Sequence, residues 1–330
     1  MAQNVLLFGE TVADGTLRPS SAELFGLGKD LAGKLGGVLA VAIFGGAVAP
    51  AQAQAAALGA DRILSATSEH LSEIMVDAYT IALETAIEEA DAGIVLLSGT
   101  TAGRDLAAFE SGKRGAAHLV DAVNVEIEGD EVIVRRPVYQ AKLLTEARAK
   151  LDKTVFVTVR SGSYAAPEAE EGRMVDVETL DVAIDPATLR VNVVELLESK
   201  AGSANLEAAD IVVIGGRGLG EAGNFPLAEQ LADAFGGAVG ATRAVTDLGW
   251  RPHYDQVGQT GRVIAPKLYV GVGVSGAVQH TVGMRGSENV VAINRDPDAP
   301  IFKLADFGIV GDLFEIVPLL IERLNAARGN

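Results

Sequence analysis

The sequence contains Val-Gly-Gln-Thr-Gly at 257–261, Gly-Val-Ser-Gly-Ala-Val-Gln-His at 273–280 and Ala-Ile-Asn-Arg-Asp-Pro-Asp-Ala-Pro-Ile-Phe at 292–302. A fourth stretch, Ala-Asp-Phe-Gly-Ile-Val-Gly-Asp-Leu-Phe, occupies 305–314. Glycine-rich turns here follow short apolar runs, and hydroxyl, amide, imidazole and carboxylate groups lie at the turns. A cofactor with a phosphate bridge, a sugar and a polar ring needs such groups. The sequence therefore predicts a nucleotide-cofactor site.

Length and composition bound the architecture. The chain has 330 residues, and single hydrophobic cores stop growing at about 250–300 residues, so two domains are expected. Hydrophobic residues make up 48% of the chain and aromatic residues only 5%, which favours α/β layers built from small and aliphatic side chains. The formal net charge is −17, so we expect no nucleic-acid partner and no anionic membrane surface as a partner.

Several kinds of site and segment are not expected. The chain has no cysteine and four scattered histidines, which excludes disulfides and thiolate metal sites and makes a metal centre unexpected. The first residues lack a basic segment before an apolar core, so we expect no targeting signal and a cytoplasmic location in a prokaryote. The uncharged stretch 36–60 is interrupted by Gly45, Gly46 and Pro50. It therefore predicts a strand, a turn and a helix instead of a membrane span.

Apolar runs of strand length alternate with helical patterns along the first part of the chain. This alternation predicts parallel strands with crossover helices. The predicted strands are 5–8, 38–44, 94–97 and 155–159, and the predicted helices are 22–35, 51–58, 72–90 and 101–112. A hairpin is predicted from 123–127 and 132–135, and 176–185 alternates as a strand does. The acidic stretch 165–172 is predicted to be a solvated loop, with a metal or partner site as the alternative.

A small, polar segment divides the chain. Residues 199–205 read Ser-Lys-Ala-Gly-Ser-Ala-Asn, a composition typical of linkers. We predict an N-terminal α/β domain at 1–200 that serves as scaffold and partner surface, a linker at 201–206, and a cofactor-binding domain at 207–330. In the second domain the predicted strands are 211–214, 238–240, 268–271 and 290–293, and the predicted helices are 226–235, 278–282 and 312–327.

Two stretches match the pattern G-x-G-x-x-G, namely residues 218–223 and 271–276. A dinucleotide-binding fold places an acidic residue about 20 positions further on. Thr242 and Arg243 stand at that place after the first match, whereas Asp296 stands there after the second. A tight turn between a strand and a helix explains either match equally well, so both interpretations stay open.

The second turn has additional signals. Ser275, Gly276 and Ala277 are predicted to begin a helix whose free N–H groups bind a pyrophosphate. Gln279 lies one turn later on the face of Ser275, and His280 is the next residue. An isolated histidine is usually an ordinary surface or core residue. Its place one turn from a predicted phosphate site favours a functional role here.

At these residues the chain resembles the α subunit of the electron-transfer flavoproteins. The stretches 257–261, 275–280 and 294–302 are similar to that family's FAD signature in order and spacing, and 215–219 and 238–243 also fit. The first half is similar more loosely, at 103–106, 134–139 and 157–160. The resemblance covers most of the chain and is highly specific only after Asp210.

The resemblance implies two α/β domains, each a mostly parallel sheet with flanking helices, the C-terminal one Rossmann-like and FAD-binding. It implies an electron carrier, without a substrate of its own, that forms a heterodimer with a β subunit holding AMP or a second FAD. It implies electron flow from flavoprotein dehydrogenases, such as the acyl-CoA dehydrogenases of fatty-acid β-oxidation, to a membrane quinone reductase. An electron-bifurcating flavoprotein subunit stays an alternative, because the second flavin of that group lies in the β subunit.

The family's FAD contacts carry over to matching positions. The flavin-side groups are Arg217, Thr242 and Arg243. The residues along the isoalloxazine edge are Val257, Gly258, Gln259 and Thr260, and the Thr260 hydroxyl faces N5. The contacts to the pyrophosphate and ribityl part are Ser275, Gly276, Ala277, Val278, Gln279 and His280. Of these, His280 reaches the flavin C2 carbonyl. The adenosine end takes Asn294, Asp312 and Leu313.

The chemistry of flavin reduction agrees with these positions. Reduction puts negative charge on the N1–C2=O edge, and a cationic neighbour such as Arg243 or His280 would raise the reduction potential. Two departures from the family pattern stand out. Thr242 occupies a position where serine is usual, and the segment 107–113 is less basic than usual, which leaves the surface contacts of the first domain open.

Two rival functions fit parts of the sequence. The G-x-G-x-x-G matches suggest an NAD(P)-dependent dehydrogenase, which would need a catalytic acid–base group that no pair of histidines or lysines provides. A nucleotide-binding scaffold without redox chemistry is the other rival. A yellow protein with flavin absorption would favour the flavoprotein, and a colourless one would favour the scaffold.

Overall fold

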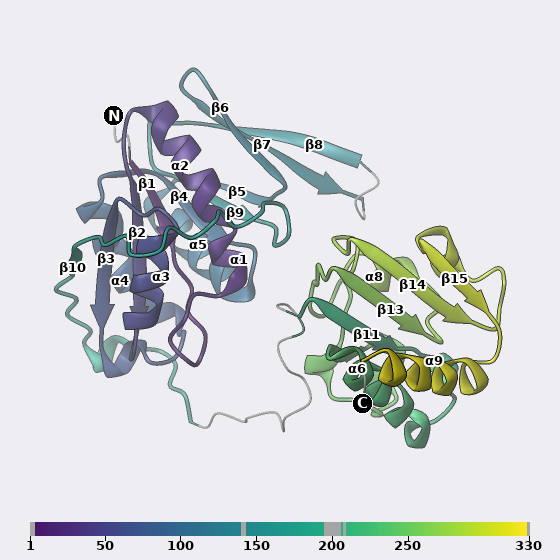
Figure 1. Cartoon of the computed structure of the whole chain (residues 1–330). Helices are drawn as coiled ribbons and strands as arrows, with labels where there is room; N and C mark the ends of the chain where they lie inside the picture. Colours follow the sequence, from purple (N-terminus) through teal and green to yellow (C-terminus); the bar gives the residue numbers. More distant parts are fainter. Residues whose placement is uncertain (1–3, 140–142, 195–205, 207–208, 329–330) are drawn as a thin grey trace. The chain divides into compact units, whose positions relative to one another are not determined.

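The structure, a computed structural model, describes residues 4–139, 143–194, 206 and 209–328. The chain falls into two compact units, unit 1 (residues 1–196) and unit 2 (residues 197–330) (Figure 1). The domain limits given above remain predictions, and residues 201–205 of the predicted linker lie outside the described residues. Each unit contains a parallel sheet with flanking helices, so the predicted fold class is confirmed at this level.

The main sheet of unit 1 is parallel, with the strand order β10-β3-β2-β1-β4-β9-β5. Its strands are β1 (Asn4–Phe8), β2 (Leu39–Gly45), β3 (Arg62–Thr67), β4 (Ala92–Ser98), β5 (Ala117–Ala122), β9 (Val155–Val159) and β10 (Val177–Thr179). Strands β2, β4 and β9 are buried along their whole length. Burial on both faces explains why their sequences are continuous apolar runs and not alternating ones.

Helices cover both faces of this sheet. On one face α2 (Leu24–Leu35) and α3 (Ala49–Ala57) contribute to the core, and on the other α4 (Val76–Glu89) and α5 (Thr101–Arg114) do so. Local capping sets the limits of α5. The Thr100 hydroxyl accepts a hydrogen bond from Gly103 N at 3.0 Å, and Gly115 ends the helix in the left-handed conformation. The short helices of unit 1 are α1 (Pro19–Ala22), η1 (Glu69–Leu71) and η2 (Pro186–Thr188).

An antiparallel sheet with the order β6-β7-β8 adds to unit 1. Its strands are β6 (Asn124–Glu128), β7 (Glu131–Val138) and β8 (Leu143–Lys150). Gly129, with a φ of 61°, makes the tight turn between β6 and β7, and the predicted hairpin is confirmed. Val125, Val132 and Val134 turn inward and join the α2 side of the core.

Unit 2 is built on a parallel sheet with the order β12-β11-β13-β14-β15. Its strands are β11 (Ile211–Gly215), β12 (Ala238–Ala241), β13 (Leu268–Val272), β14 (Asn289–Asn294) and β15 (Phe307–Val310). Helices α6 (Pro226–Phe235) and α9 (Leu313–Arg328) pack on one face. The shorter helices are α7 (Arg243–Asp247), α8 (Val278–Thr281), η3 (Arg217–Leu219), η4 (Ala222–Asn224), η5 (His253–Asp255) and η6 (Pro300–Lys303).

The strand order qualifies the expectation of a Rossmann-like C-terminal domain. Counted along unit 2, the order is 2-1-3-4-5, which is a doubly wound order but not the 3-2-1-4-5-6 order of the dinucleotide-binding fold. The neighbours β3-β2-β1-β4, which begin that second order, occur in unit 1. The Rossmann-like label for unit 2 is therefore not confirmed.

Several elements differ from the sequence expectation. Helix 226–235 has the predicted limits, whereas the strands β3, β5, β8 and β15 were not predicted. The strand expected over 176–185 is only the three residues of β10. Among the described residues no helix is long and apolar enough to cross a membrane.

Candidate functional site

The carboxyl ends of the strands of unit 2 meet along one edge, because all the strands run parallel (Figure 1). Strand β12 lies on one side of β11 and β13 lies on the other, so the winding reverses between β11 and β13. In open α/β sheets ligands bind at such a reversal, outside the carboxyl ends of the strands. Most of the predicted site residues follow the ends of these strands, whereas Asn294 is the last residue of β14 and the loop 257–260 follows η5 beside the end of β12. We call this region the carboxyl edge.

Glycines allow the turns after β11 and β13 to lie against each other. Gly216 N donates to Val272 O at 2.9 Å, and Gly218 N donates to Gly273 O at 3.0 Å. A Cβ atom on Gly218 would lie 2.7 Å from the Gly273 Cα, which no real side chain tolerates. Gly218 of the first G-x-G-x-x-G match and Gly273 of the second therefore have a structural reason: together with Gly216 they let the two turns lie against each other at the reversal.

Two arginines of the carboxyl edge point into solvent. Arg217 begins η3 after β11, and its exposed side chain forms no hydrogen bond or ion pair with another residue in the described part of the chain. Arg243 begins α7 after β12, and its side chain is 62% exposed with Nε 3.2 Å from Asp247 Oδ2. Thr242 precedes it and is buried, with its backbone N donating to Gly215 O. The two guanidinium groups are open to an anionic ligand.

The loop 257–260 is joined to the turn after β13. Gln259 N donates to Gln279 O at 2.7 Å, and a Cβ on Gly258 would lie 2.7 Å from the same oxygen. Gly258 has a φ of 149°, so glycine is needed there on both counts. Val257 is buried, whereas Gln259 and Thr260 are exposed. The structure thus brings the 257–261 and 275–280 stretches together.

The turn after β13 offers unused hydrogen-bond donors. The N–H groups of Ser275, Gly276 and Ala277 donate to no acceptor in the described part of the chain. Ser275 and Gln279 are exposed, and their side chains have no hydrogen-bond partner among the described residues. Ala277 is exposed, Val278 is half-buried and Gly276 is buried. Helix α8 begins at Val278 and lasts one turn, which confirms the helix predicted at 278–282 and shows that the helix start expected at Ser275 is wrong.

His280 is buried and uses both ring nitrogens within the protein. Its Nδ1 lies 2.9 Å from Val257 O, which can only accept, so Nδ1 carries the proton. Its Nε2 lies 2.8 Å from the Tyr269 hydroxyl. Burial lowers the pKa of His280 to about 4, although the hydrogen bond to Val257 O acts in the opposite direction. The expectation that His280 supplies a positive charge is therefore wrong at neutral pH.

The remaining predicted residues lie at the ends of β14 and β15. Asn294 is half-buried, and its Nδ2 donates to Val274 O at 2.9 Å, which ties β14 to the turn after β13. Asp312 is exposed, and its Oδ1 accepts from Phe314 N at 2.8 Å at the start of α9. Leu313 is buried between α9 and the sheet. As arranged here, these residues stabilise the turns of the carboxyl edge.

Sequence reasoning missed a set of buried polar groups beneath the loop. Gln256 and Thr246 are 3% and 6% exposed, and their side chains are hydrogen-bonded to each other at 2.9 Å. Asp255 is completely buried and pairs with Arg251 at 2.7 Å, and burial raises its pKa despite that partner. Gln256 directly precedes Val257, so its position next to the 257–261 stretch could have indicated it from the sequence.

The carboxyl edge fits an anionic dinucleotide by the chemistry of its donors. It presents two accessible guanidinium groups, exposed hydroxyls at Thr260 and Ser275, and backbone N–H groups at 275–277 that have no acceptor among the described residues. These groups suit a pyrophosphate and a polar ring. No group of three or more His, Cys, Asp or Glu in the described residues could hold a metal ion.

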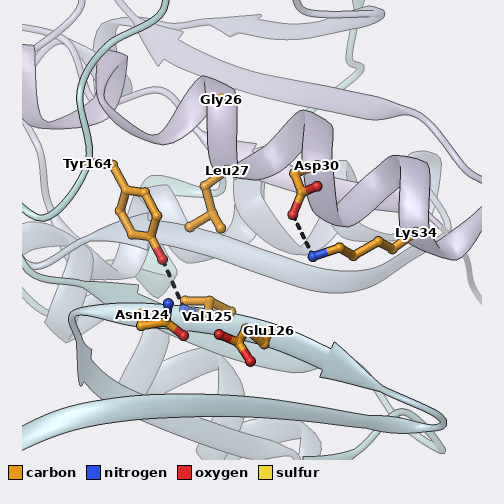
Figure 2. A pocket seen from close by; sticks show the side chains of 8 residues that line it. All are labelled: Gly26, Leu27, Asp30, Lys34, Asn124, Val125, Glu126 and Tyr164. Atoms are coloured by element: carbon orange, nitrogen blue, oxygen red, sulfur yellow. Dashed lines mark hydrogen bonds and ion pairs between the residues drawn. The ribbon is translucent and has the colours of Figure 1, made fainter.

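Unit 1 contains a hollow of about 340 Å³, and the residues that line it are distant in sequence from those of the carboxyl edge. Figure 2 shows it between helix α2 and strand β6, lined by Gly26, Leu27, Asp30, Lys34, Asn124, Val125, Glu126 and Tyr164. Lys34 pairs with Asp30 at 2.7 Å, and this hydrogen bond raises the lysine pKa. The Tyr164 hydroxyl accepts from Val125 N, and burial raises its pKa. Both side chains therefore keep their protons at neutral pH.

Comparison with known proteins supports a cofactor site at the carboxyl edge. Residues 205–285 match the electron transfer flavoprotein FAD-binding domain, and residues 5–185 match the electron transfer flavoprotein domain. The chain is 36% identical over 322 residues to the electron transfer flavoprotein subunit alpha of Bacillus subtilis, covering 98% of this chain and 97% of that one. It is also 36% identical over 332 residues to the Mycobacterium leprae protein of the same name, with both chains covered completely.

Proposed function

The chain belongs to the electron transfer flavoprotein α-subunit family and its cofactor is FAD, and from this premise we propose that it is the FAD-carrying half of a heterodimeric electron carrier. Bound FAD supplies the ring that accepts and gives up electrons. The protein's own share is to hold that ring, set its potential and expose it to partners. The similarity to proteins named subunit alpha, over 98% of this chain, supports a β subunit as the partner.

The exposed groups of the carboxyl edge support the assignment of the binding residues. Arg217 and Arg243 lie on the flavin side, and the loop 257–260 lies along the ring edge with the Thr260 hydroxyl toward N5. The free N–H groups of 275–277, with Ser275 and Gln279, take the pyrophosphate and ribityl part. Asn294, Asp312 and Leu313 form the adenosine end. His280 joins this set as a neutral donor or acceptor whose contact with the flavin requires a rearrangement at Tyr269, because both its nitrogens are already bonded.

We assign electron transfer without a substrate of its own, from flavoprotein dehydrogenases such as acyl-CoA dehydrogenases to a membrane quinone reductase. The donors and the acceptor follow from the family resemblance. The observation that carries the proposal is the combination, at the carboxyl edge, of exposed guanidinium groups with backbone N–H groups that have no acceptor among the described residues.

The experiment is expression of the chain together with its β subunit, followed by FAD analysis and an electron-transfer assay. We expect one FAD in this chain and loss of flavin absorbance when a catalytic amount of acyl-CoA dehydrogenase and its substrate are added. Arg217→Gln should weaken FAD retention roughly tenfold, as loss of a charged hydrogen bond does. Arg285→Gln is the matched control, because Arg285 is also exposed but lies in the segment leading to the amino end of β14. A colourless heterodimer, or equal losses in both variants, would refute the proposal.

A further inference from the structure

A line of polar side chains runs from helix α7 under the carboxyl edge to the exposed loop. The Thr246 Oγ1 lies 2.9 Å from Gln256 Oε1, and the Gln256 Nε2 lies 2.9 Å from Thr260 Oγ1. Thr246 and Gln256 are buried, whereas Thr260 is exposed. Gln256 is therefore a bridge between the protein interior and the hydroxyl that the proposed function places at the flavin.

The protons along this line have two complete arrangements. The Thr246 hydroxyl has one proton but two acceptors within reach, Gln256 Oε1 at 2.9 Å and Arg243 O at 3.0 Å. Turning the Gln256 amide by 180° exchanges its oxygen and nitrogen without moving the line. Either choice leaves every bond of the line with one donor and one acceptor.

The two arrangements differ in what Thr260 presents outward. In the first, Thr246 donates to Gln256, the amide N–H donates to Thr260, and the Thr260 proton points outward as a donor. In the second, Thr246 donates to Arg243 O, the amide N–H donates to Thr246, and Thr260 donates inward to the amide oxygen. Thr260 then presents only a lone pair. A flavin N5 without a proton accepts a hydrogen bond and one with a proton donates, so each arrangement matches one form of N5.

We propose that Gln256 is a positioning residue that determines, through Thr260, whether the protein offers a donor or an acceptor to the flavin. This inference rests on the proposed function, because it needs Thr260 at the flavin.

The backbone around Gln256 is held in place by hydrogen bonds, so a turn of the amide would leave the loop where it is. Gln256 O accepts from Arg262 N at 2.8 Å, and Gln256 N donates to His253 O at 3.0 Å. The preceding Asp255 is anchored to Arg251, which also pairs with Glu229 on α6 at 2.5 Å. Because the backbone is fixed, the line of side chains can respond to a change at the flavin by reversing the direction of its hydrogen bonds.

The test is a pair of double-mutant cycles on the FAD-loaded heterodimer, with the flavin reduction potential as the readout. Gln256→Met removes the amide at similar length, and Thr246→Val removes the far hydroxyl at the same shape. Each is combined with Thr260→Val. We expect each single change to alter the redox equilibrium constant about fivefold, the contribution of one hydrogen bond. In the Thr260→Val background neither change should have a further effect, and Thr260→Ser should restore the response to Gln256→Met.

A second readout is the resonance Raman spectrum of the oxidised flavin, whose ring vibrations respond to a hydrogen bond at N5. Gln256→Met and Thr260→Val should shift the same bands, which a general loss of stability would not do. Additive effects on the potential in both cycles, or different Raman bands, would overturn the inference while leaving the proposed function intact. A Thr260→Val protein with unchanged potential and spectrum would instead overturn the placement of Thr260, and with it this inference. If Gln256→Met does not fold, the Thr246→Val cycle decides.

Discussion

Arg243 is an exposed charged side chain beside the proposed flavin position. Its exposure and its pairing with Asp247 mean that water and a carboxylate screen its charge, so its contribution should be about 1 kcal/mol. A tenfold change in a one-electron equilibrium corresponds to about 59 mV and about 1.4 kcal/mol. Arg243→Ala should therefore lower the first flavin reduction potential by about 40 mV.

Potentiometry of the flavin-replete variant checks this expectation. Arg243→Lys should recover part of the potential, because the charge persists while the planar guanidinium is lost. An Arg243→Ala protein with the potential of the wild type would show that Arg243 has a structural role only.

His280 makes stability depend on pH in a definite direction. Its folded-state pKa is about 4 and its ordinary value is 6.5, so between these values the unfolded chain binds a proton that the folded chain does not. The free energy of unfolding should therefore fall as the pH is lowered from about 6.5 to about 4. Above that window the neutral imidazole keeps both of its hydrogen bonds.

Denaturant unfolding of the wild type and of His280→Gln over this pH range measures the effect. The variant should be less stable at pH 7, because a fitted buried ring is lost, but its stability should depend less steeply on pH. His118, whose pKa burial also lowers, remains in both proteins and cancels in the comparison. Identical pH slopes would contradict the inferred burial of a neutral His280.

At the scale of elements, the turns after β11 and β13 lie close together at Gly216, Gly218 and Gly273. Gly218→Ala would place a Cβ 2.7 Å from Gly273 Cα and 2.8 Å from Gly273 O. Because these neighbours are backbone atoms, the turns must separate, at a cost of about 1–3 kcal/mol. The midpoint of thermal unfolding should fall and FAD should be held more weakly.

Gly223→Ala is the matched control for this prediction. Gly223 belongs to the same G-x-G-x-x-G stretch, but its nearest neighbour would be the flexible end of Glu221 at 3.7 Å. A melting temperature and an FAD affinity close to those of the wild type are expected for Gly223→Ala. If both alanines have equal effects, the pattern as a whole binds the cofactor, and the contact between the turns is not the reason why glycine is required at position 218.

At the scale of the whole molecule, the residues of the proposed cofactor site all belong to unit 2. Unit 2 contains the whole carboxyl edge, and its two core clusters lie on either face of its own sheet. Within unit 1 the corresponding reversal, between β1 and β4, is filled by the protein itself. There the buried Glu10 accepts from Arg18 Nε at 2.6 Å and from the Thr100 hydroxyl at 2.7 Å.

We therefore expect flavin to follow unit 2. In a heterodimer cleaved between the units, FAD should remain with residues 207–330, and a fragment of residues 1–200 should hold none. Separation of the fragments by size, with absorbance at the flavin band, measures the distribution. Flavin recovered with residues 1–200 would contradict the division of roles.

The residue patterns of this chain determined its fold class, its family and the stretches that line the carboxyl edge, because glycine turns after buried apolar strands are local features. Tertiary structure decided the rest. Strand β8 contains Leu-Leu-Thr-Glu-Ala-Arg-Ala-Lys at 143–150, mostly helix-forming residues, and it is a strand because it pairs with β7 along its length. The charge of His280 depends on burial beside Tyr269 and Val257, and the bridging role of Gln256 depends on Thr246 and Thr260 meeting it in space. Pairing, burial and proton direction are set by neighbours distant in the chain or by how a turn folds back on itself, and a linear pattern does not contain them.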